Sequence, residues 1–140
     1  MIKILFVCHG NICRSPMAEY VMKELCKKAG VSAQIASVAV SREELGNPIY
    51  PPAQRELNKH GIPFDRRAAR QITQADVDGY DRIFYMDSSN ARYLARMFPT
   101  ETKFEPFLER GVADPWYTGD FSQTWLDICE GCQRILEEIK

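Results

Sequence analysis

A cysteine and an arginine with five residues between them stand near the start of the chain, in the segment Cys8-His9-Gly10-Asn11-Ile12-Cys13-Arg14-Ser15-Pro16. The guanidinium of Arg14 is a planar fork that can bind two oxygens of one oxyanion. Gly10 permits backbone conformations that a side chain would forbid, so successive N–H groups can turn inward as an anion-binding nest. A field that attracts an oxyanion also favours a thiolate, and Cys8 is therefore a candidate nucleophile.

The residues on either side of this segment predict the elements that position it. Ile2 to Val7 is apolar except for Lys3, which is typical of a buried parallel strand. We predict Ser15 as the N-cap of the following helix and Pro16 as its first residue. The helix start then offers unpaired N–H groups and the positive end of a dipole. In open α/β sheets, ligands bind at this carboxyl edge of the strands.

The rest of the chain alternates between strand-like and helix-like patterns. Further strands are predicted over residues 33–40, 82–86 and 103–107. Helical periodicity covers residues 15–30, 52–61, 88–98 and 125–139. Gly30 is the expected end of the first of these helices, and Ser88 the expected N-cap of the third. The stretch 41–52, with one glycine and three prolines, is predicted as a loop and helix start, and the stretch 62–73 shows no regular period. This order predicts an α/β fold, with a four-stranded parallel sheet flanked by helices on both faces, in a single doubly wound domain over residues 1–140.

Composition narrows the class of protein. The 140 residues are 45% apolar and 26% charged, which is ordinary for one soluble domain. A net charge of -1 without a concentrated basic face argues against a nucleic-acid partner. No apolar stretch approaches the roughly 18 to 20 residues of a membrane span. An odd number of cysteines and the lack of a signal-like start favour a reducing cytoplasm. We expect no membrane association, and a monomer.

The opening segment and a second motif, Asp114-Pro115-Trp116-Tyr117, together resemble the low-molecular-weight protein tyrosine phosphatases over essentially the whole chain. The resemblance implies that Cys8 attacks the phosphorus of a phosphotyrosine-containing protein and forms a phosphocysteine. Arg14 would bind the phosphoryl oxygens, and Asp114 would protonate the leaving group and then activate water. Inorganic phosphate is the implied product. No cofactor and no metal are implied.

The other residues of the opening segment are assigned to phosphate binding by the same resemblance. The candidates are His9, Gly10, Asn11, Ile12, Cys13, Arg14 and Ser15. Asn11 is expected to shape the loop, since asparagine tolerates a left-handed backbone. Ser15 could donate its hydroxyl to the thiolate as well as cap the helix. Cys13 is the expected redox partner, able to trap an oxidised Cys8 as a disulfide.

Aromatic residues and three departures from the family pattern bear on the substrate. Trp116 and Tyr117 are expected to form an aromatic wall of the cleft, which suits an aryl phosphate. Ile12 agrees with relatives that act on phosphotyrosine, whereas those that favour phosphoarginine carry threonine there. The departures are Glu43 in the cleft, where a tryptophan is common, Tyr50 in place of an acidic residue, and Arg67 in place of a histidine that braces the loop. Glu43 is expected to favour different flanking charges on a substrate.

Other functions remain open at this point. The same loop could serve a phosphoarginine phosphatase or an arsenate reductase, although arsenate chemistry needs relay cysteines and none lies between Cys26 and Cys129. A third hypothesis is a phosphate-sensing or redox-sensing module without catalytic activity. Cys129 and Cys132 lie on the apolar face of the last predicted helix, and we interpret both as core residues.

Overall fold

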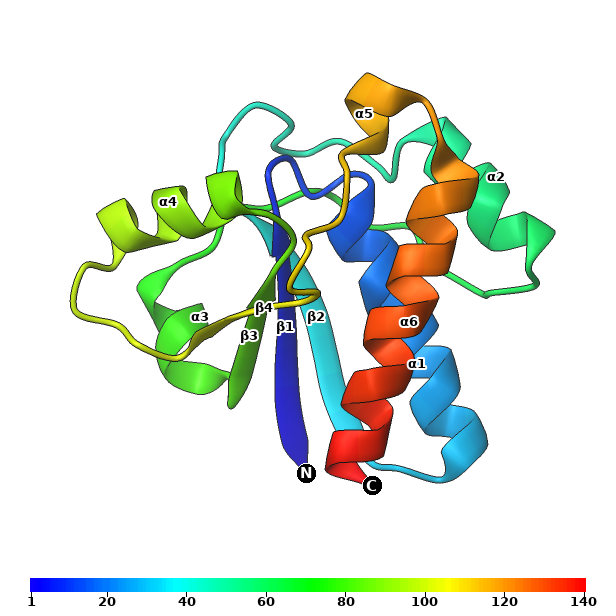
Figure 1. The fold of residues 1–140 in the computed structure, drawn as a ribbon, viewed down its shortest axis with the longest axis horizontal. Coiled ribbons are helices and arrows are strands. Elements are labelled where there is room, and N and C mark those ends of the chain that lie inside the picture. The colour runs from blue at the N-terminus through cyan, green and yellow to red at the C-terminus, as the bar shows by residue number, and fades with distance from the viewer.

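In the computed structural model, which describes residues 1–140, one sheet of four parallel strands runs through the molecule (Figure 1). The strands are β1 (Ile2–Cys8), β2 (Ala33–Ala39), β3 (Arg82–Tyr85) and β4 (Phe104–Pro106). The helices are α1 (Arg14–Ala29), α2 (Pro51–Lys59), α3 (Gln74–Gly79), α4 (Ser88–Met97), α5 (Pro115–Thr118) and α6 (Phe121–Ile139). The predicted α/β fold with four parallel strands is confirmed.

The central strand β1 is buried on both faces, which explains its nearly continuous apolar sequence. Ile4 and Phe6 point into the larger core, on the face covered by α1 and α6. Leu5 and Val7 point into a second core on the opposite face, which α3 and α4 cover. Alternating side chains of one strand therefore hold both layers of helices against the sheet.

The strand order β2-β1-β3-β4 places the functional loops next to each other. The chain leaves β1 through α1 to reach β2 on one side, and later returns to β3 on the other side of β1. The order thus reverses between β1 and β3, and at such a point the loops leaving the two strands diverge and open a crevice. Cys8 is the last residue of β1, and Asp87 lies two residues beyond the end of β3.

The segment between β4 and α5 carries Asp114, and contacts with α6 and with Met86 fix its position. The Phe107 ring is fully buried against Gly131 of α6, where an added Cβ would lie 2.2 Å from the ring. The backbone N–H of Val112 donates to the Met86 carbonyl at 2.8 Å. The absence of a side chain at Gly131 thus lets α6 pack against this segment and fix its course.

Two predicted helix starts were wrong. Helix α1 begins at Arg14, so Ser15 lies inside the first turn and Cys13 occupies the N-cap position without a side-chain cap. The Ser15 hydroxyl instead contacts the Cys8 sulfur and accepts a hydrogen bond from the Asn11 side chain. The N-cap of α4 is Asp87, not Ser88, because the Asp87 carboxylate forms a capping box with Asn90.

The other differences concern short elements and end points. Helices α3 and α5 were not predicted, since 6 and 4 residues are too few to show a helical period. Helix α6 begins at Phe121, four residues before its apolar stripe, with Asp120 as N-cap. Gly30 ends α1 with φ 69°, as predicted. Cys132 is buried in the larger core, as expected, but the same prediction for Cys129 was wrong, since this residue is only half-buried and lies outside that core cluster. No helix combines the length and apolarity needed to cross a membrane.

Candidate active site

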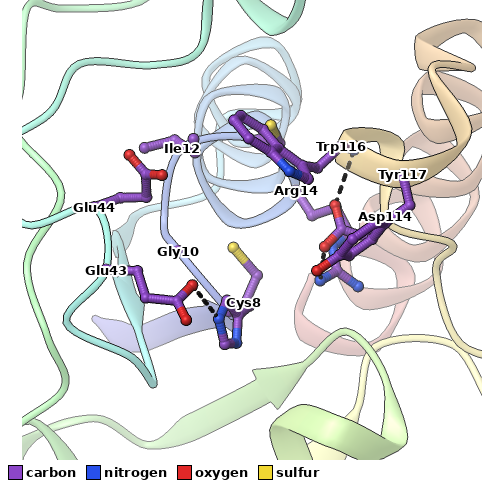
Figure 2. A pocket seen from close by; sticks show the side chains of 11 residues that line it. Cys8, Gly10, Ile12, Arg14, Glu43, Glu44, Asp114, Trp116 and Tyr117 are labelled. Carbon is purple, nitrogen blue, oxygen red and sulfur yellow. Dashed lines mark hydrogen bonds and ion pairs between the residues drawn. The ribbon is translucent and has the colours of Figure 1, made fainter.

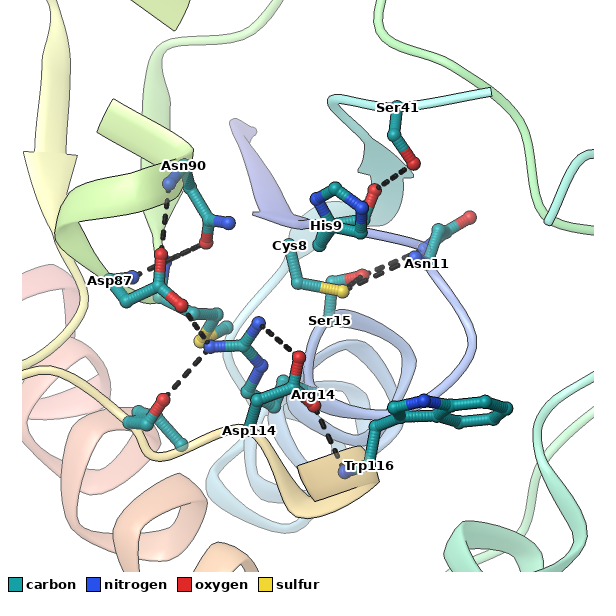
Figure 3. A network of polar contacts seen from close by, with 12 residues as sticks. Cys8, His9, Asn11, Arg14, Ser15, Ser41, Asp87, Asn90, Asp114 and Trp116 are labelled. Carbon is teal, nitrogen blue, oxygen red and sulfur yellow. Dashed lines mark hydrogen bonds and ion pairs between the residues drawn. The ribbon is translucent and has the colours of Figure 1, made fainter. Parts of the chain in front are cut away.

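Residues 8–15, here called the anion loop, wrap around the thiol of Cys8. The Cys8 Sγ lies 3.0 Å from the Ser15 Oγ and accepts a hydrogen bond from the backbone N–H of Asn11 at 3.3 Å (Figure 3). Cys8 is 2% exposed, and it lines a pocket together with the side of the loop that faces solvent. The Asn11 N–H is directed at the sulfur, and the Ser15 hydroxyl, which also lies 3.4 Å from the Val38 carbonyl oxygen, can donate to the sulfur when the thiol is ionised. Both groups stabilise a negative charge there. Ser15 is therefore close enough to donate to the thiolate, as predicted, but it does not cap the helix.

Asn11 holds the bend of the anion loop. It is the one residue other than glycine with a positive φ, 60°, and it is fully buried. Its side-chain amide donates to the Ser15 Oγ at 2.8 Å and to the Ser37 Oγ at 2.9 Å. These bonds explain why an asparagine stands here: it tolerates the left-handed backbone and fills the turn with a polar group whose donors are satisfied.

Arg67 supplies the outer support of the anion loop. Its guanidinium donates to the backbone carbonyl of Asn11 at 2.8 Å and, through the second nitrogen, to the Asn11 side-chain carbonyl. Burial lowers the pKa of Arg67, which the charge of Glu19 opposes. Arg67, noted above as a departure, therefore braces the loop in place of the histidine, because an arginine fork reaches two acceptors of the same residue.

Removing the Arg67 side chain tests this support. Arg67→Ala is expected to lower kcat roughly 10- to 100-fold, because a displaced anion loop no longer presents the thiol and the N–H groups in register. It should also lower the free energy of unfolding by about 1–3 kcal/mol, since the buried backbone carbonyl of Asn11 loses its donor and the Asn11 side-chain oxygen keeps only the Arg70 N–H at 3.3 Å. Steady-state kinetics at a temperature where all variants are folded measures the first effect, and urea denaturation measures the second.

The neighbouring Arg66 provides the control for that experiment, because it is exposed and makes no side-chain hydrogen bond. Arg66→Ala should leave both quantities close to those of the unmodified protein. Arg67→His keeps one donor and should recover part of kcat. An unchanged kcat per folded molecule in Arg67→Ala would show that Arg67 contributes to stability alone.

The guanidinium of Arg14 lines the side of the pocket and is only 2% exposed. One nitrogen donates to the Asp87 carboxylate at 2.6 Å and to the Val112 carbonyl at 2.9 Å, and the other donates to Asp114 at 3.2 Å (Figure 3). Burial disfavours the charge, but the negative charges of Cys8 and Asp114 and the bond to Asp87 outweigh it and raise the pKa of Arg14. The side chain is a permanent, oriented cation.

Asp87 is ionised because its hydrogen-bond partners stabilise the carboxylate. Its burial disfavours the charged form, but the hydrogen bonds from Arg14 and from the backbone N–H of Asn90 outweigh that effect and lower the pKa of Asp87. The carboxylate therefore keeps its charge at neutral pH and orients Arg14 toward the pocket.

Asp114 lies across the pocket from the thiol (Figure 2). It is the N-cap of α5, and its carboxylate accepts from the backbone N–H of Trp116 at 3.0 Å. Its other oxygen faces Arg14. Pro115, the first residue of α5, fixes the backbone behind it. The predicted pair of nucleophile and acid is thus brought to opposite sides of one pocket.

The aromatic wall beyond Asp114 is supported by Tyr50. Trp116 and Tyr117 are 52% and 83% exposed, and both line the pocket. The ring centroids of Tyr50 and Trp116 are 4.9 Å apart, and the Tyr50 N–H donates to the Ile12 carbonyl at 2.9 Å. Tyr50, noted above as a departure, therefore links the wall to the anion loop.

The opposite wall is polar. Nε2 of His9 lies 2.7 Å from a carboxylate oxygen of Glu43, and the His9 ring meets the edge of Tyr93 with centroids 5.6 Å apart. Glu44 also lines the pocket, and the sequence did not single it out. Only its position directly after Glu43 could have drawn attention to it. The carbonyl of Val112 was also missed, because a backbone acceptor carries no residue-type signal.

The gathered groups can bind a tetrahedral oxyanion and attack it. The thiol of Cys8 forms the floor, Arg14 and the anion loop line the pocket where oxygens of an oxyanion would bind, and Asp114 faces the thiol. Cys13 also lines the pocket, where burial, and next the charges of Cys8 and Asp114, raise the pKa of its thiol. No group of three or more His, Cys, Asp or Glu side chains is arranged to hold a metal ion.

Comparison with known proteins places this geometry in context. Residues 3–140 match the family model described as low molecular weight phosphotyrosine protein phosphatase. The low molecular weight protein-tyrosine-phosphatase YfkJ of Bacillus subtilis (strain 168) is 37% identical, with 100% of this chain and 97% of the relative covered. PtpA of Staphylococcus aureus (strain Newman) is 33% identical, with 99% and 94% covered. The crystal structure of SP-PTP from Streptococcus pyogenes superposes with a TM-score of 0.94 at 42% identity, over 100% of this chain and 94% of that one.

Proposed function

Because this chain belongs to the low molecular weight phosphotyrosine protein phosphatase family, we propose that Cys8, Arg14 and Asp114 divide the hydrolysis of protein phosphotyrosine among them. The protein is a cysteine-dependent protein tyrosine phosphatase that acts on phosphoproteins. The observation that carries the assignment of roles is the placement of a thiol, in contact with the Asn11 N–H and the Ser15 hydroxyl, opposite a carboxylate in one pocket beside a buried arginine.

In the first step, the Cys8 thiolate attacks phosphorus while the bond from phosphorus to the tyrosine oxygen breaks. Asp114 gives its proton to that oxygen, so tyrosine leaves as a neutral phenol and the carboxyl becomes a carboxylate. The phosphoryl group stays on sulfur as a phosphocysteine. Covalent catalysis of this kind replaces one difficult displacement with two easier ones.

In the second step, the Asp114 carboxylate takes a proton from a water molecule whose oxygen attacks phosphorus. The bond between sulfur and phosphorus breaks, inorganic phosphate leaves, and Cys8 returns as a thiolate. The Ser15 hydroxyl and the Asn11 N–H, at 3.0 and 3.3 Å from the sulfur, stabilise the thiolate as it departs. The same carboxyl thus acts first as an acid and then as a base.

Arg14 stabilises the charge that spreads over the three equatorial oxygens in both steps. Its bonds to Asp87 and Val112 set its orientation before substrate arrives, so little reorganisation is needed during the reaction. The raised pKa of Arg14 keeps the charge in place throughout the cycle.

The preference for an aryl phosphate rests on the wall of the pocket. Trp116 and Tyr117 expose ring surface beside the pocket, where a tyrosine ring can pack against it. Ile12 lines the same pocket and presents an apolar side chain, which suits a phenyl ring better than a guanidinium.

Three peptides of identical sequence, carrying phosphotyrosine, phosphoserine or phosphoarginine, test the proposed substrate. We expect the highest kcat/KM for phosphotyrosine, measured as released phosphate, because only that side chain reaches the floor while its ring packs against the aromatic wall. A higher kcat/KM for phosphoarginine would overturn the choice of substrate while leaving the covalent chemistry intact.

We also propose that Cys13 protects Cys8 from irreversible oxidation. Peroxide oxidises the Cys8 thiolate to a sulfenic acid, and the Cys13 thiol then attacks that sulfur, forms a disulfide and releases water. Both thiols are free and line the same pocket, which supports the pairing. The raised pKa of Cys13 predicts that the disulfide forms slowly.

For its setting in the cell, we propose a monomer with one domain over residues 1–140 that works in the reducing cytoplasm. All five cysteines carry free thiols, the state that a reducing compartment maintains. Both cores pack on one sheet, which supports a single domain.

A further inference from the structure

Two carboxylates line a pocket whose floor is built to bind an anion. Glu43 and Glu44 stand on the same wall of the pocket (Figure 2). The Glu43 side chain is 67% exposed and pairs with His9, while Glu44 accepts a hydrogen bond from the neutral amide of Asn47 at 2.6 Å. A neutral donor leaves the charge of Glu44 uncompensated. Neither carboxylate has a part in the two chemical steps.

The segment that carries these carboxylates is fixed at both ends. Its beginning is tied to the anion loop, since the N–H and the hydroxyl of Ser41 both donate to the His9 carbonyl, at 3.1 and 2.9 Å. Its end is tied to residue 69, since the Gly46 N–H donates to the Ala69 carbonyl at 2.9 Å. The backbone that carries the two glutamates is therefore held in place before any ligand binds, which reduces the entropy lost on binding.

Glu44 rests directly on the anion loop. A Cβ added to Gly10 would lie 3.1 Å from the Glu44 Cγ, so the aliphatic part of the glutamate packs over this glycine. Glu44 is also the smallest of the causes that raise the pKa of Cys13, after burial and the charges of Cys8 and Asp114. The carboxylate is thus part of the rim of the pocket and not a distant surface charge.

The two walls of the pocket differ in character. Asp114, Trp116 and Tyr117 lie on one side, and the two glutamates lie on the other (Figure 2). A phosphotyrosine whose phosphate reaches Cys8 must carry its neighbouring residues over this rim. A lysine or arginine beside the phosphotyrosine would meet the glutamate wall, whereas an acidic neighbour would be repelled there.

We propose that Glu43 and Glu44 form a subsite for a basic side chain next to the phosphotyrosine of a protein substrate. This inference rests on the proposed function and names the class of phosphoprotein it selects. The ligand is a lysine or arginine, held by charge and by hydrogen bonds to carboxylate oxygens. Glu44 contributes more than Glu43, because the Glu43 carboxylate is already paired with the His9 ring.

Matched phosphotyrosine peptides with lysine, glutamine or glutamate on both sides of the phosphotyrosine test the subsite. The ratio of kcat/KM for the lysine peptide to that for the glutamate peptide is expected to be about five to ten at low ionic strength, the range for a few exposed charge pairs. It should fall toward one as salt screens the charges. The double variant Glu43→Gln/Glu44→Gln should bring the ratio close to one, and Glu44→Lys should invert it.

Glu109→Gln is the matched control, since Glu109 is exposed, lies outside the pocket and makes no ion pair. This variant should keep the ratio of the unmodified protein. Equal kcat/KM for the three peptides, or a ratio that survives in the double variant, would overturn the subsite. Hydrolysis of p-nitrophenyl phosphate by the unmodified protein distinguishes a failure of the proposed function from a failure of the subsite. No hydrolysis contradicts the proposed function, whereas hydrolysis without a peptide preference contradicts the subsite alone.

Discussion

Replacing Cys8 with serine is expected to reduce phosphatase turnover by roughly 10⁴-fold or more while the fold survives. A serine hydroxyl is not ionised at neutral pH, and the donors that stabilise a thiolate do not supply a base to remove its proton. The substitution is nearly isosteric, so the buried position at the end of β1 stays filled. Steady-state hydrolysis of an aryl phosphate measures the loss, and circular dichroism checks the fold.

The same variant should still bind inorganic phosphate, because Arg14 and the N–H groups of the anion loop remain in place. Calorimetric titration with phosphate measures that binding. Cys129→Ser is the matched control, since Cys129 is half-buried in α6 and outside the pocket, and it should keep normal turnover. Turnover by Cys8→Ser comparable to that of the unmodified protein would remove Cys8 from the role of nucleophile.

Asp114→Asn is expected to lower kcat for phosphotyrosine peptides by about 10²- to 10⁴-fold, the usual contribution of a general acid or base. Asparagine can still cap α5 by accepting from the Trp116 N–H, so the local structure is preserved while the proton is lost. A good leaving group needs little protonation. The loss in the first step should therefore be much smaller for an activated phenol such as p-nitrophenol, and single-turnover kinetics with both substrates measures the difference.

Asp120→Asn controls for the loss of a negative charge in the same region, because Asp120 caps α6 and does not line the active-site pocket. It should leave both rates close to normal. Equal losses for poor and good leaving groups in Asp114→Asn would show that Asp114 acts through charge or positioning and not as a proton donor.

Much of the fold could be predicted because its signals are local. The apolar run of β1 and the helical stripes of α1 and α6 are long enough for a period to be recognised. Helices α3 and α5 are single turns or little more, stabilised by caps and by their place in the tertiary structure. Such elements leave no periodic pattern in the sequence.

The site was predictable to the extent that its residues are neighbours in sequence. The anion loop could be identified because Cys8 and Arg14 share one short segment. The contacts that orient them could not, since Arg14 bonds to Asp87 and Val112, 73 and 98 residues away. That Arg67 braces the loop could not be predicted either, because its reach to Asn11, 56 residues earlier, depends on the path of the chain.

The central claim is that Cys8 carries the phosphoryl group between the two chemical steps. Its most direct test is to mix the protein with an excess of an aryl phosphate, quench in acid within one turnover, digest, and locate the phosphoryl group by mass spectrometry. The proposed mechanism predicts one phosphoryl group on the sulfur of Cys8, in an amount matching the burst of released phenol. A phosphoryl group on any other residue, or a burst without a phosphorylated peptide, would contradict it.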